Sequence, residues 1–241
     1  MRALLTLWLS TVGLLAQAPL ESLLLLKAPT AASSPTPELL WWKMNDGSGT
    51  TITGTVGGDG TTDADWAIGS GWTYLDFNGS TDDATKNSNL NPAVNVVSVS
   101  FWLNPDSIAL NGLFDLGSEA AVNSFHILFN TSLGGSVYGD SGRRQEPFDP
   151  PSTATWTHVV MILDGSTANG DVRCFYDKVE QTPNGSPIDT KTGTSNFASA
   201  SFQVADYAGL GFFYGGLMDD VRIYNRALSQ GEIDQIYADR Q

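Results

Sequence analysis

The sequence predicts an all-β protein: a two-sheet antiparallel sandwich with a short C-terminal helix. Three observations favour it. Only 16% of the 241 residues are charged and 25 are glycine, which is typical of turn-rich β proteins. Residues 97–103 and 156–163 alternate with the period of two that strands show. Residues 216–237 combine an alternating strand with a capped helix at the end of the chain.

The N-terminal segment, residues 1–27, is apolar. Arg2, an apolar run over residues 3–15 and the small-x-small motif Ala16-Gln17-Ala18 are features of a secretory signal peptide. Pro19 disfavours cleavage directly after that motif, so cleavage after Ala32 and retention of the whole segment both stay open. Cleavage predicts an extracellular protein, whereas a retained segment predicts an arm that docks the protein to neighbouring subunits.

Residues 28–38 are rich in proline, serine, threonine and alanine, which predicts an extended linker that packs poorly. The folded domain is predicted to cover residues 39–241. About 200 residues suit one large β domain with a full core.

Two strands are predicted near the middle of this domain. Val97, Val99, Phe101 and Leu103 alternate with polar residues until Pro105, which predicts a half-buried strand. Residues 156–163 are apolar on both faces, as in a middle strand of a sandwich, and a turn over 164–171 connects them to a strand over 172–176. The single cysteine, Cys174, lies in that last strand and is predicted to be a buried, inert thiol. Residues 51–71 and 182–201 show little periodicity and are predicted to be loops or short strands.

The last strand has one acid on each face. Strict alternation places Met218, Asp220, Arg222 and Tyr224 on one face, and Leu217, Asp219, Val221 and Ile223 on the other. Ser229 and Glu232 then form a capping box that starts a short helix with Ile233, Ile236 and Tyr237 toward the core.

This end of the chain resembles LamG-like jelly rolls of the concanavalin A-like lectin and glucanase superfamily, which close with a Gly-x-Ile-Asp-Asp-Val-Arg-Ile-Tyr-Asn-Arg-Ala-Leu-Ser strand. Further resembling blocks lie at residues 41–51, 75–80, 97–103 and 155–160. The resemblance covers about residues 39–238 and implies a jelly-roll sandwich. In the family Asp-Gly commonly follows the strand that corresponds to 172–176. Here the pair is Asp177-Lys178, which predicts a different turn geometry or mild strain.

The resemblance also implies a structural calcium ion. It places the metal beside the last strand's acid, the loop after the first strand and the Phe-Asn-Gly turn, which here correspond to Asp219, Asp46 and the carbonyls of Asn78 or Gly79. The alternative is that Asp219 accepts hydrogen bonds from backbone amides or pairs with an arginine.

Sugar recognition requires exposed aromatic faces beside polar groups, and four aromatic residues outside the clear strand patterns are the candidates. The alternative for each is packing in the core or at a sheet edge. The predicted ligand-binding residues are Trp66, Trp72, Phe213 and Tyr214.

Several functions are disfavoured. The net charge of −14 would repel phosphate backbones, so nucleic acid is not a predicted partner. The Glu-x-Asp-x-x-Glu strand of the superfamily's glucanases is absent, and neighbouring Asp219 and Asp220 would point to opposite faces. The two histidines, His126 and His158, lie in strand-like runs, where a structural role is expected.

The leading hypothesis is therefore a non-catalytic, secreted recognition module, a lectin-like domain stabilised by calcium that binds a glycan or cell-surface polysaccharide. The alternative is a structural protein of a virion or cell-surface assembly, such as a decoration or fibre protein, docked through residues 1–27. A divergent glycosidase is the third hypothesis.

Overall fold

The computed structural model describes residues 33–69, 71–117, 121–129, 132–207 and 210–239. The chain divides into two units, residues 1–32 and 33–241, and the described residues belong to the second. The predictions made for the leader at residues 1–27 and for the first part of the linker therefore lie outside the described residues. No helix in the described ranges is long and apolar enough to cross a membrane.

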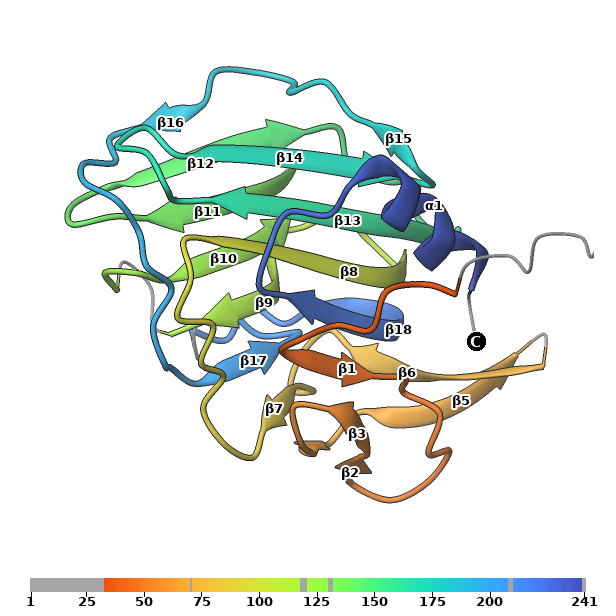
Figure 1. Cartoon of the computed structure of the whole chain (residues 1–241). Helices are drawn as coiled ribbons and strands as arrows, with labels where there is room; N and C mark the ends of the chain where they lie inside the picture. The colour runs from red at the N-terminus through yellow and green to blue at the C-terminus, as the bar shows by residue number, and fades with distance from the viewer. Residues whose placement is uncertain (1–32, 70, 118–120, 130–131, 208–209, 240–241) are drawn as a thin grey trace, which may run out of the picture. The chain divides into compact units, whose positions relative to one another are not determined.

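The first sheet is antiparallel and runs in the order β15-β14-β13-β8-β18-β1-β3, with β6 also beside β18 and β5 beside β6 (Figure 1). Its strands are β1 (Leu40–Trp42), β3 (Gly54–Val56), β5 (Asp65–Gly69), β6 (Trp72–Asn78), β8 (Val96–Pro105), β13 (Thr157–Asp164), β14 (Asp171–Tyr176), β15 (Val179–Glu180) and β18 (Gly215–Tyr224). The strands predicted over 97–103, 156–163, 172–176 and 217–224 are confirmed.

The second sheet runs in the order β16-β12-β11-β10-β9-β17-β7-β4-β2. Its strands are β2 (Thr51–Ile52), β4 (Gly60–Thr62), β7 (Ala84–Lys86), β9 (Asn111–Leu116), β10 (Phe125–Phe129), β11 (Leu133–Tyr138), β12 (Arg143–Phe148), β16 (Ile188–Asp189) and β17 (Phe202–Val204). The first half of the 51–71 segment supplies short strands to both sheets.

The two sheets pack face to face on one continuous core, as the sequence predicted. Residues from both sheets meet there, among them Phe101 of β8 and Phe114 of β9, whose ring centroids are 4.5 Å apart. Cys174 belongs to this core and is fully buried, and burial raises the pKa of its thiol. The prediction of an inert cysteine agrees with both findings.

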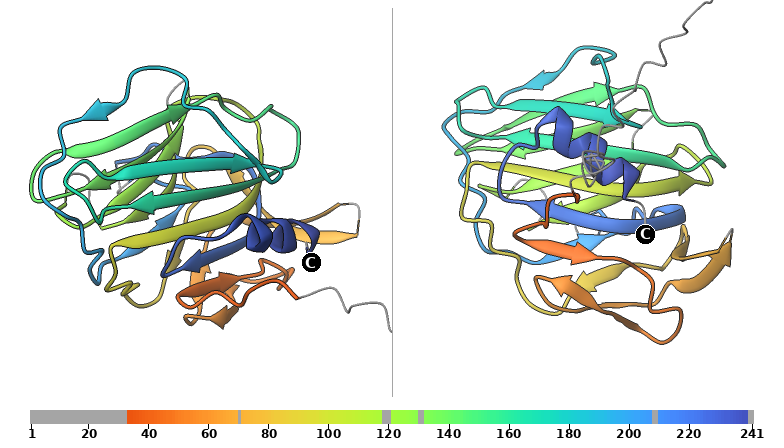
Figure 2. Two further views of the ribbon diagram at one scale, coloured as in Figure 1. Left: turned by 45° about the horizontal axis from the view of Figure 1, so that its top comes forward. Right: turned by 45° about the vertical axis from the view of Figure 1, so that its right-hand side comes forward.

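Helix α1 (Gln230–Ala238) covers the outer face of the first sheet (Figures 1 and 2). The predicted capping box is present, with Ser229 accepting from the backbone N–H of Glu232 and the Glu232 carboxylate accepting from that of Ser229. Ile233 and Ile236 pack in a second apolar cluster against the first sheet, beside Val160, Ile162, Phe175, Tyr224 and Leu228. Because this segment covers β8, the polar face of that strand is buried as well, and the half-buried strand predicted there is wrong.

A bulge in β18 corrects the predicted assignment of its faces. The register against β8 shifts between Asp219 and Arg222, and Asp220 has a φ of 50°. Met218 therefore points into the main core, as Val221 and Ile223 do. The prediction that Met218 lies on the same face as Arg222 and Tyr224 is wrong.

The described end of the predicted linker packs on the sandwich. Ser34 Oγ accepts from Arg222 Nη1 at 3.0 Å, and the carbonyl of Pro35 accepts from the Tyr224 hydroxyl at 3.1 Å. Glu38 pairs with Arg226 at 3.0 Å. The prediction that this stretch packs poorly is therefore wrong for residues 34–38.

Candidate functional site

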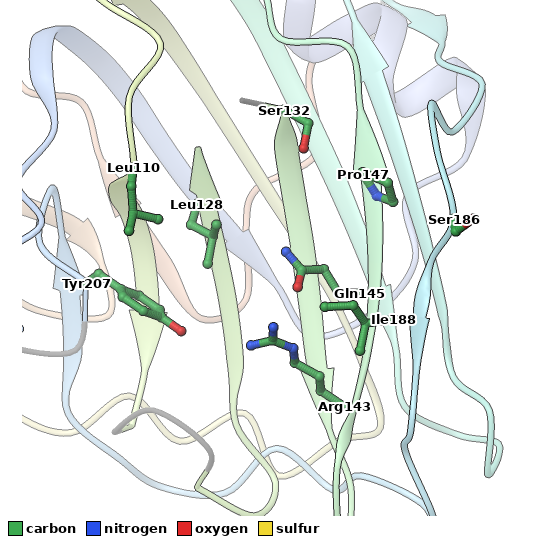
Figure 3. Close-up of a pocket in the computed structure, with 9 residues that line it drawn as sticks. All are labelled: Leu110, Leu128, Ser132, Arg143, Gln145, Pro147, Ser186, Ile188 and Tyr207. Atoms are coloured by element: carbon green, nitrogen blue, oxygen red, sulfur yellow. The ribbon is translucent and has the colours of Figure 1, made fainter. Parts of the chain in front are cut away.

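A cavity of about 310 Å³ lies on the outer face of the second sheet, the face turned away from the core (Figure 3). Strands β10 and β12 supply its floor, while the segments before β9 and β11, around β16 and after β17 supply its walls. The lining residues are Leu110, Leu128, Ser132, Arg143, Gln145, Pro147, Ser186, Ile188 and Tyr207.

The alternation of β12 explains why one strand contributes three of these residues. Arg143, Gln145 and Pro147 are two positions apart and therefore share the outer face. Phe148 points the other way, into the core. Pro147 is tolerated because β16 pairs only with Arg144 and Gln145, so no ladder hydrogen bond is lost at the proline nitrogen.

The polar groups of the cavity rest on buried side chains of the neighbouring strands. Arg143 Nη1 donates to the Tyr138 hydroxyl at 3.1 Å. The rings of Tyr138 and Tyr207 both meet the His126 ring edge to face, with centroids 5.0 and 5.6 Å away. His126 is fully buried and bonds through Nδ1 to the carboxylate of Asp115, directly opposite on β9. The lining residues Arg143 and Tyr207 therefore share one buried support.

Two buried polar atoms near the floor have no hydrogen-bond partner within the described ranges. They are Ser136 Oγ and Gln145 Oε1, and their residues lie opposite each other on β11 and β12. A buried acceptor or donor without a partner costs about 1–3 kcal/mol. Buried polar side-chain atoms in native proteins usually have a hydrogen-bond partner, so this pair is unusual.

Asp115, His126 and Ser124 superficially resemble a catalytic triad. His126 Nε2 lies 3.4 Å from Ser124 Oγ, beyond the usual range for a nucleophile and its base. Ser124 is buried and donates its proton to the carbonyl of Ala121 at 2.6 Å. The arrangement is therefore a buried support, in agreement with the structural role predicted for His126. His158 is similarly buried, 2.9 Å from Ser100 Oγ.

The two tryptophans predicted to bind ligand lie on a hairpin of the first sheet. Trp66 is in β5 and Trp72 begins β6, so both tryptophans lie in strands that pair with each other. Trp66 packs partly against the core, and its indole N–H donates to the carbonyl of Gly49 at 2.7 Å. Neither residue lines the cavity on the second sheet.

Of the two other predicted aromatic residues, Tyr214 is fully buried. Its ring packs against Phe77 and Phe129, and its hydroxyl donates to the carbonyl of Leu217 at 3.0 Å. A buried ring cannot stack on a sugar, so the prediction is wrong for Tyr214. Phe213 is half-buried just before β18, outside the cavity lining.

The Phe-Asn-Gly turn has its own hydrogen bonds. Asn78 Oδ1 accepts from the backbone N–H groups of Ser80 and Thr81 at 2.8 and 2.9 Å, which closes the turn after β6. Asn78 lies opposite Gly215 at the beginning of β18. Asp219 lies four residues further along β18, opposite Trp102, and is fully buried.

Asp46 lies toward the other end of β6. Its Oδ2 accepts from the backbone N–H of Thr53 at 2.9 Å, and its neighbour Gly47 lies close to Thr73. Thr73 and Asn78 are five residues apart, about 17 Å along a strand, whereas calcium binds oxygens at about 2.3–2.6 Å. One ion therefore cannot bind all four predicted residues, and the four-residue calcium site is wrong. Within the described ranges no three His, Cys, Asp or Glu side chains are arranged to hold a metal. A contribution from Asp46 or Asp219 alone stays a prediction.

Three cavity residues, Arg143, Gln145 and Tyr207, were not predicted from the sequence. The period-two pattern Arg143-x-Gln145-x-Pro147 was a usable signal, because it indicates a strand with a polar outer face. Tyr207 follows a short strand in an irregular segment, and its place above His126 comes from sheet pairing, which no local pattern shows.

Comparisons with known proteins support the architecture. No relative is found among curated sequences. Domain 4 of AbnA, a GH43 extracellular arabinanase from Geobacillus stearothermophilus solved in complex with arabinotriose, is similar with a TM-score of 0.60 and 20% identity, over 84% of this chain and 100% of that chain. The receptor binding domain of botulinum neurotoxin mosaic serotype C/D is similar with a TM-score of 0.61 and 13% identity, over 84% and 50%.

Trypanosoma rangeli sialidase, solved with the inhibitor DANA, is similar with a TM-score of 0.60 and 15% identity, over 86% of this chain and 33% of the sialidase. This chain thus spans half of the toxin domain and a third of the sialidase. At these identities the similarity shows a shared fold. The family model of the concanavalin A-like lectin/glucanases superfamily matches residues 78–234, and the chain therefore belongs to that superfamily.

Proposed function

We propose that the protein is a non-catalytic, extracellular glycan-binding module whose binding site is the cavity on the outer face of β9–β12. The observation that carries this proposal is the lining of that cavity. The hydroxyl end of Tyr207, a residue that is only 6% exposed, shares the cavity with the guanidinium of Arg143 and the amide of Gln145 (Figure 3). Leu110, Leu128 and Ile188 supply aliphatic surface. Sugars offer C–H faces that pack on rings and aliphatic groups, and hydroxyls that need oriented polar partners.

The size of the cavity suits a short stretch of glycan. Its 310 Å³ lies at the lower end of the roughly 300–1,000 Å³ typical of small-molecule sites. Domain 4 of the arabinanase, which is similar in fold, was solved in complex with arabinotriose. That similarity supports glycan binding on this fold without specifying the sugar.

A binding role is favoured over hydrolysis because glycoside hydrolysis usually needs two carboxylates about 5–10 Å apart across the bond. The described residues that line the cavity include no aspartate or glutamate. Asp115, which supports the cavity, is buried and bonded to His126.

A glycan array probed with the full chain tests the proposal, followed by calorimetric titration of any glycan bound. Tyr207→Ala should weaken binding at least about tenfold, because truncating an aromatic residue that anchors a ligand typically costs about 2 kcal/mol. Trp66→Ala on the first sheet is the matched aromatic control and should bind normally. No glycan bound, or binding lost in Trp66→Ala and kept in Tyr207→Ala, would overturn the assignment of this cavity.

The calcium role and secretion stay predictions. Thermal unfolding of the full chain with Ca²⁺ and with EDTA tests the calcium role, since a ligand at a hundred times its dissociation constant stabilises by about 2.7 kcal/mol. Sequencing the N-terminus of the native protein tests secretion against an assembly arm: a start after Ala18 or Ala32 supports secretion, and a retained Met1 supports assembly.

A further inference from the structure

We propose that this cavity selects uncharged sugars, that the Gln145 amide binds one of their hydroxyl groups, and that Gly134 positions this amide. The inference rests on the proposed function and adds the chemical class of the ligand and two residues that decide it. It comes from the register of four strands, the unpaired polar atoms at the floor, the missing side chain of Gly134 and the charges around the cavity.

A row of polar side chains crosses the outer face of the second sheet and ends in the cavity. In the register of β9 to β12, His126 lies opposite Asp115 on one side and opposite Ser136 on the other. Ser136 in turn lies opposite Gln145, which lines the cavity. Asp115 and His126 bond to each other. Ser136 Oγ and Gln145 Oε1 are buried, and neither has a partner in the part of the chain that the structure describes. Unused hydrogen-bonding capacity therefore lies at the cavity end of the row.

A hydroxyl is the ligand group that fits these two atoms. Gln145 Oε1 can only accept a hydrogen bond, whereas the Ser136 hydroxyl can donate one. A sugar hydroxyl can donate to the amide oxygen and accept from the serine, because the two residues lie directly opposite each other on adjacent strands. The terminal torsion of a glutamine is broad, so the amide can turn toward such a group. A carboxylate has no proton to donate to the amide oxygen and fits less well.

Gly134 leaves the room in which the Gln145 amide lies. On β11 this glycine lies between Leu128 of β10 and Pro147 of β12, both of which line the cavity. A Cβ added to Gly134 would lie 2.9 Å from Gln145 Nε2, closer than a real Cβ approaches a neighbouring atom. In Figure 3 the amide projects from β12 into the cavity, on the side of Leu128. The missing side chain of Gly134 therefore determines where the amide can lie.

The charges around the cavity favour an uncharged ligand. The lining contains the cation of Arg143, but acidic residues lie close to it. Asp189 and Asp206 are each next to a lining residue in the chain, and Asp115 supports the floor through His126. The whole chain carries a formal charge of −14. An anion gains little attraction in such surroundings, whereas the binding of a neutral sugar does not depend on them.

Calorimetric titration of the full chain against neutral and acidic oligosaccharides tests the inference. The neutral compounds are arabinotriose, xylotriose, cellotriose and galactotriose, and trigalacturonate is the acidic counterpart of the last. The best neutral ligand is then compared with derivatives in which one hydroxyl at a time is replaced by hydrogen. The variants are Gln145→Met, which keeps a long side chain without the amide, and Gly134→Ala. Gly231→Ala in α1 is the matched control, because a Cβ there meets no atom within 4 Å.

We expect at least one neutral compound to bind more tightly than trigalacturonate. Removing one particular hydroxyl should weaken its binding about tenfold, because the site then keeps an unpaired polar group. Gln145→Met should weaken the parent compound by a similar factor and should no longer respond to removal of that hydroxyl, since both changes remove the same contact. Gly134→Ala should weaken the parent compound too, but not when combined with Gln145→Ala, whose short side chain cannot meet the new Cβ. Gly231→Ala should bind like the wild type.

The inference is overturned when trigalacturonate binds more tightly than every neutral compound, when no single hydroxyl affects binding, or when Gln145→Met binds as the wild type does. The last two results would mean that water alone pairs with the polar atoms of the floor. In all three cases a loss in Tyr207→Ala still supports the proposed function. Absence of binding both to this panel and to the glycan array removes the proposed function and the inference together. Should Gln145→Met fail to fold by circular dichroism, the hydroxyl series with wild-type protein and with Gly134→Ala still decides.

Discussion

Arg222 is a fully buried cation in β18, and its contacts join distant parts of the domain. Its Nε and Nη2 donate to the two oxygens of Asp220 at 2.9 and 2.7 Å. The Trp41 ring lies 4.5 Å from the guanidinium, and Ser34 accepts from Nη1. The β-bulge brings Asp220 beside Arg222, so the bulge and the ion pair depend on each other.

Removing this cation should destabilise the protein strongly. Arg222→Leu leaves the Asp220 carboxylate buried without its charge partner, which typically costs about 3–5 kcal/mol. Urea unfolding of the full chain measures the loss. The control is Arg173→Leu, which breaks the exposed pair with Glu180 and should cost under about 1 kcal/mol. Similar losses for the two variants would contradict a structural role for the buried pair.

Asp83 gives a pH-dependent prediction. Partial burial, followed by the charges of Asp63, Asp206 and Asp82, raises the pKa of its carboxyl from 3.8 to about 6. The folded state then binds the proton more tightly than the unfolded state, so stability falls as pH rises through the interval from about 4 to 6. Asp83→Asn should therefore raise the melting temperature at pH 7 and leave it unchanged at pH 3.5.

The size of this gain is modest because the side chain of Asp83 is partly exposed and solvent screens its neighbours. About 1 kcal/mol, or 2–4 °C, is expected after that screening. Asp46→Asn removes a charge from an exposed carboxylate outside this group and is the matched control. An equal gain at both pH values would show that Asp83 is not the group responsible.

Single residues were predictable where the chemistry is local. The Ser229–Glu232 capping box and the buried Cys174 follow from the neighbouring sequence and are confirmed. The burial of Tyr214 was not predictable from the local sequence. It depends on contacts with Phe77 and Phe129, which sheet pairing and packing bring to the Tyr214 ring. Arg143 was not predicted for the same reason. The outer face of β12 forms a cavity only because β16 and the segment after β17, which are distant in sequence, lie around it.

At the scale of elements, the turn between β14 and β15 carries the strain that the sequence predicted. Asp177 and Lys178 both have positive φ, 45° and 77°. A turn of this kind favours glycine at its second position, since a side chain in the left-handed region costs about 1–2 kcal/mol. The turn thus has positive φ at both positions, as Asp-Gly turns favour, and the mild strain falls on Lys178.

Lys178→Gly should therefore stabilise the protein by about 0.5–1 kcal/mol. The gain from relieving φ exceeds the loss of the Lys178 Nζ contact with the Tyr237 ring, 4.8 Å from its centroid, which is worth about 0.5 kcal/mol. Lys178→Ala removes that contact without relieving φ and should be neutral or destabilising. Chemical denaturation distinguishes the two, and equal effects of glycine and alanine would contradict strain at this position.

Long strands were predicted well, and short ones were not. β8, β13 and β18 each bury apolar residues over many positions, so their period of two is visible in the sequence. β2 and β3 have two and three residues, too few to show a period. The bulge in β18 was not predicted either. An alternating pattern assumes that successive side chains always point to opposite faces, and a bulge breaks that rule.

At the scale of the whole domain, the outer faces of the two sheets differ in what covers them. On the outer face of the first sheet, Ile233 and Ile236 of helix α1 and Leu228 just before the helix pack against the strands. The outer face of the second sheet carries the cavity of Arg143, Gln145 and Tyr207. The resemblance implied the sandwich correctly, but a fold shared by many functions does not locate the site. Trp66 and Trp72, predicted from the sequence, lie on the first sheet, whereas the cavity that we propose as the binding site lies on the second.

The most direct test of this account is methyl NMR of the full chain, titrated with a glycan that binds on the array. The cavity account predicts that shifts concentrate on the methyl groups of Leu110, Leu128 and Ile188, and that Tyr207→Ala abolishes them. Shifts confined to Ile68 on the β5–β6 hairpin, beside Trp66 and Trp72, would contradict it and restore the site that the sequence first indicated.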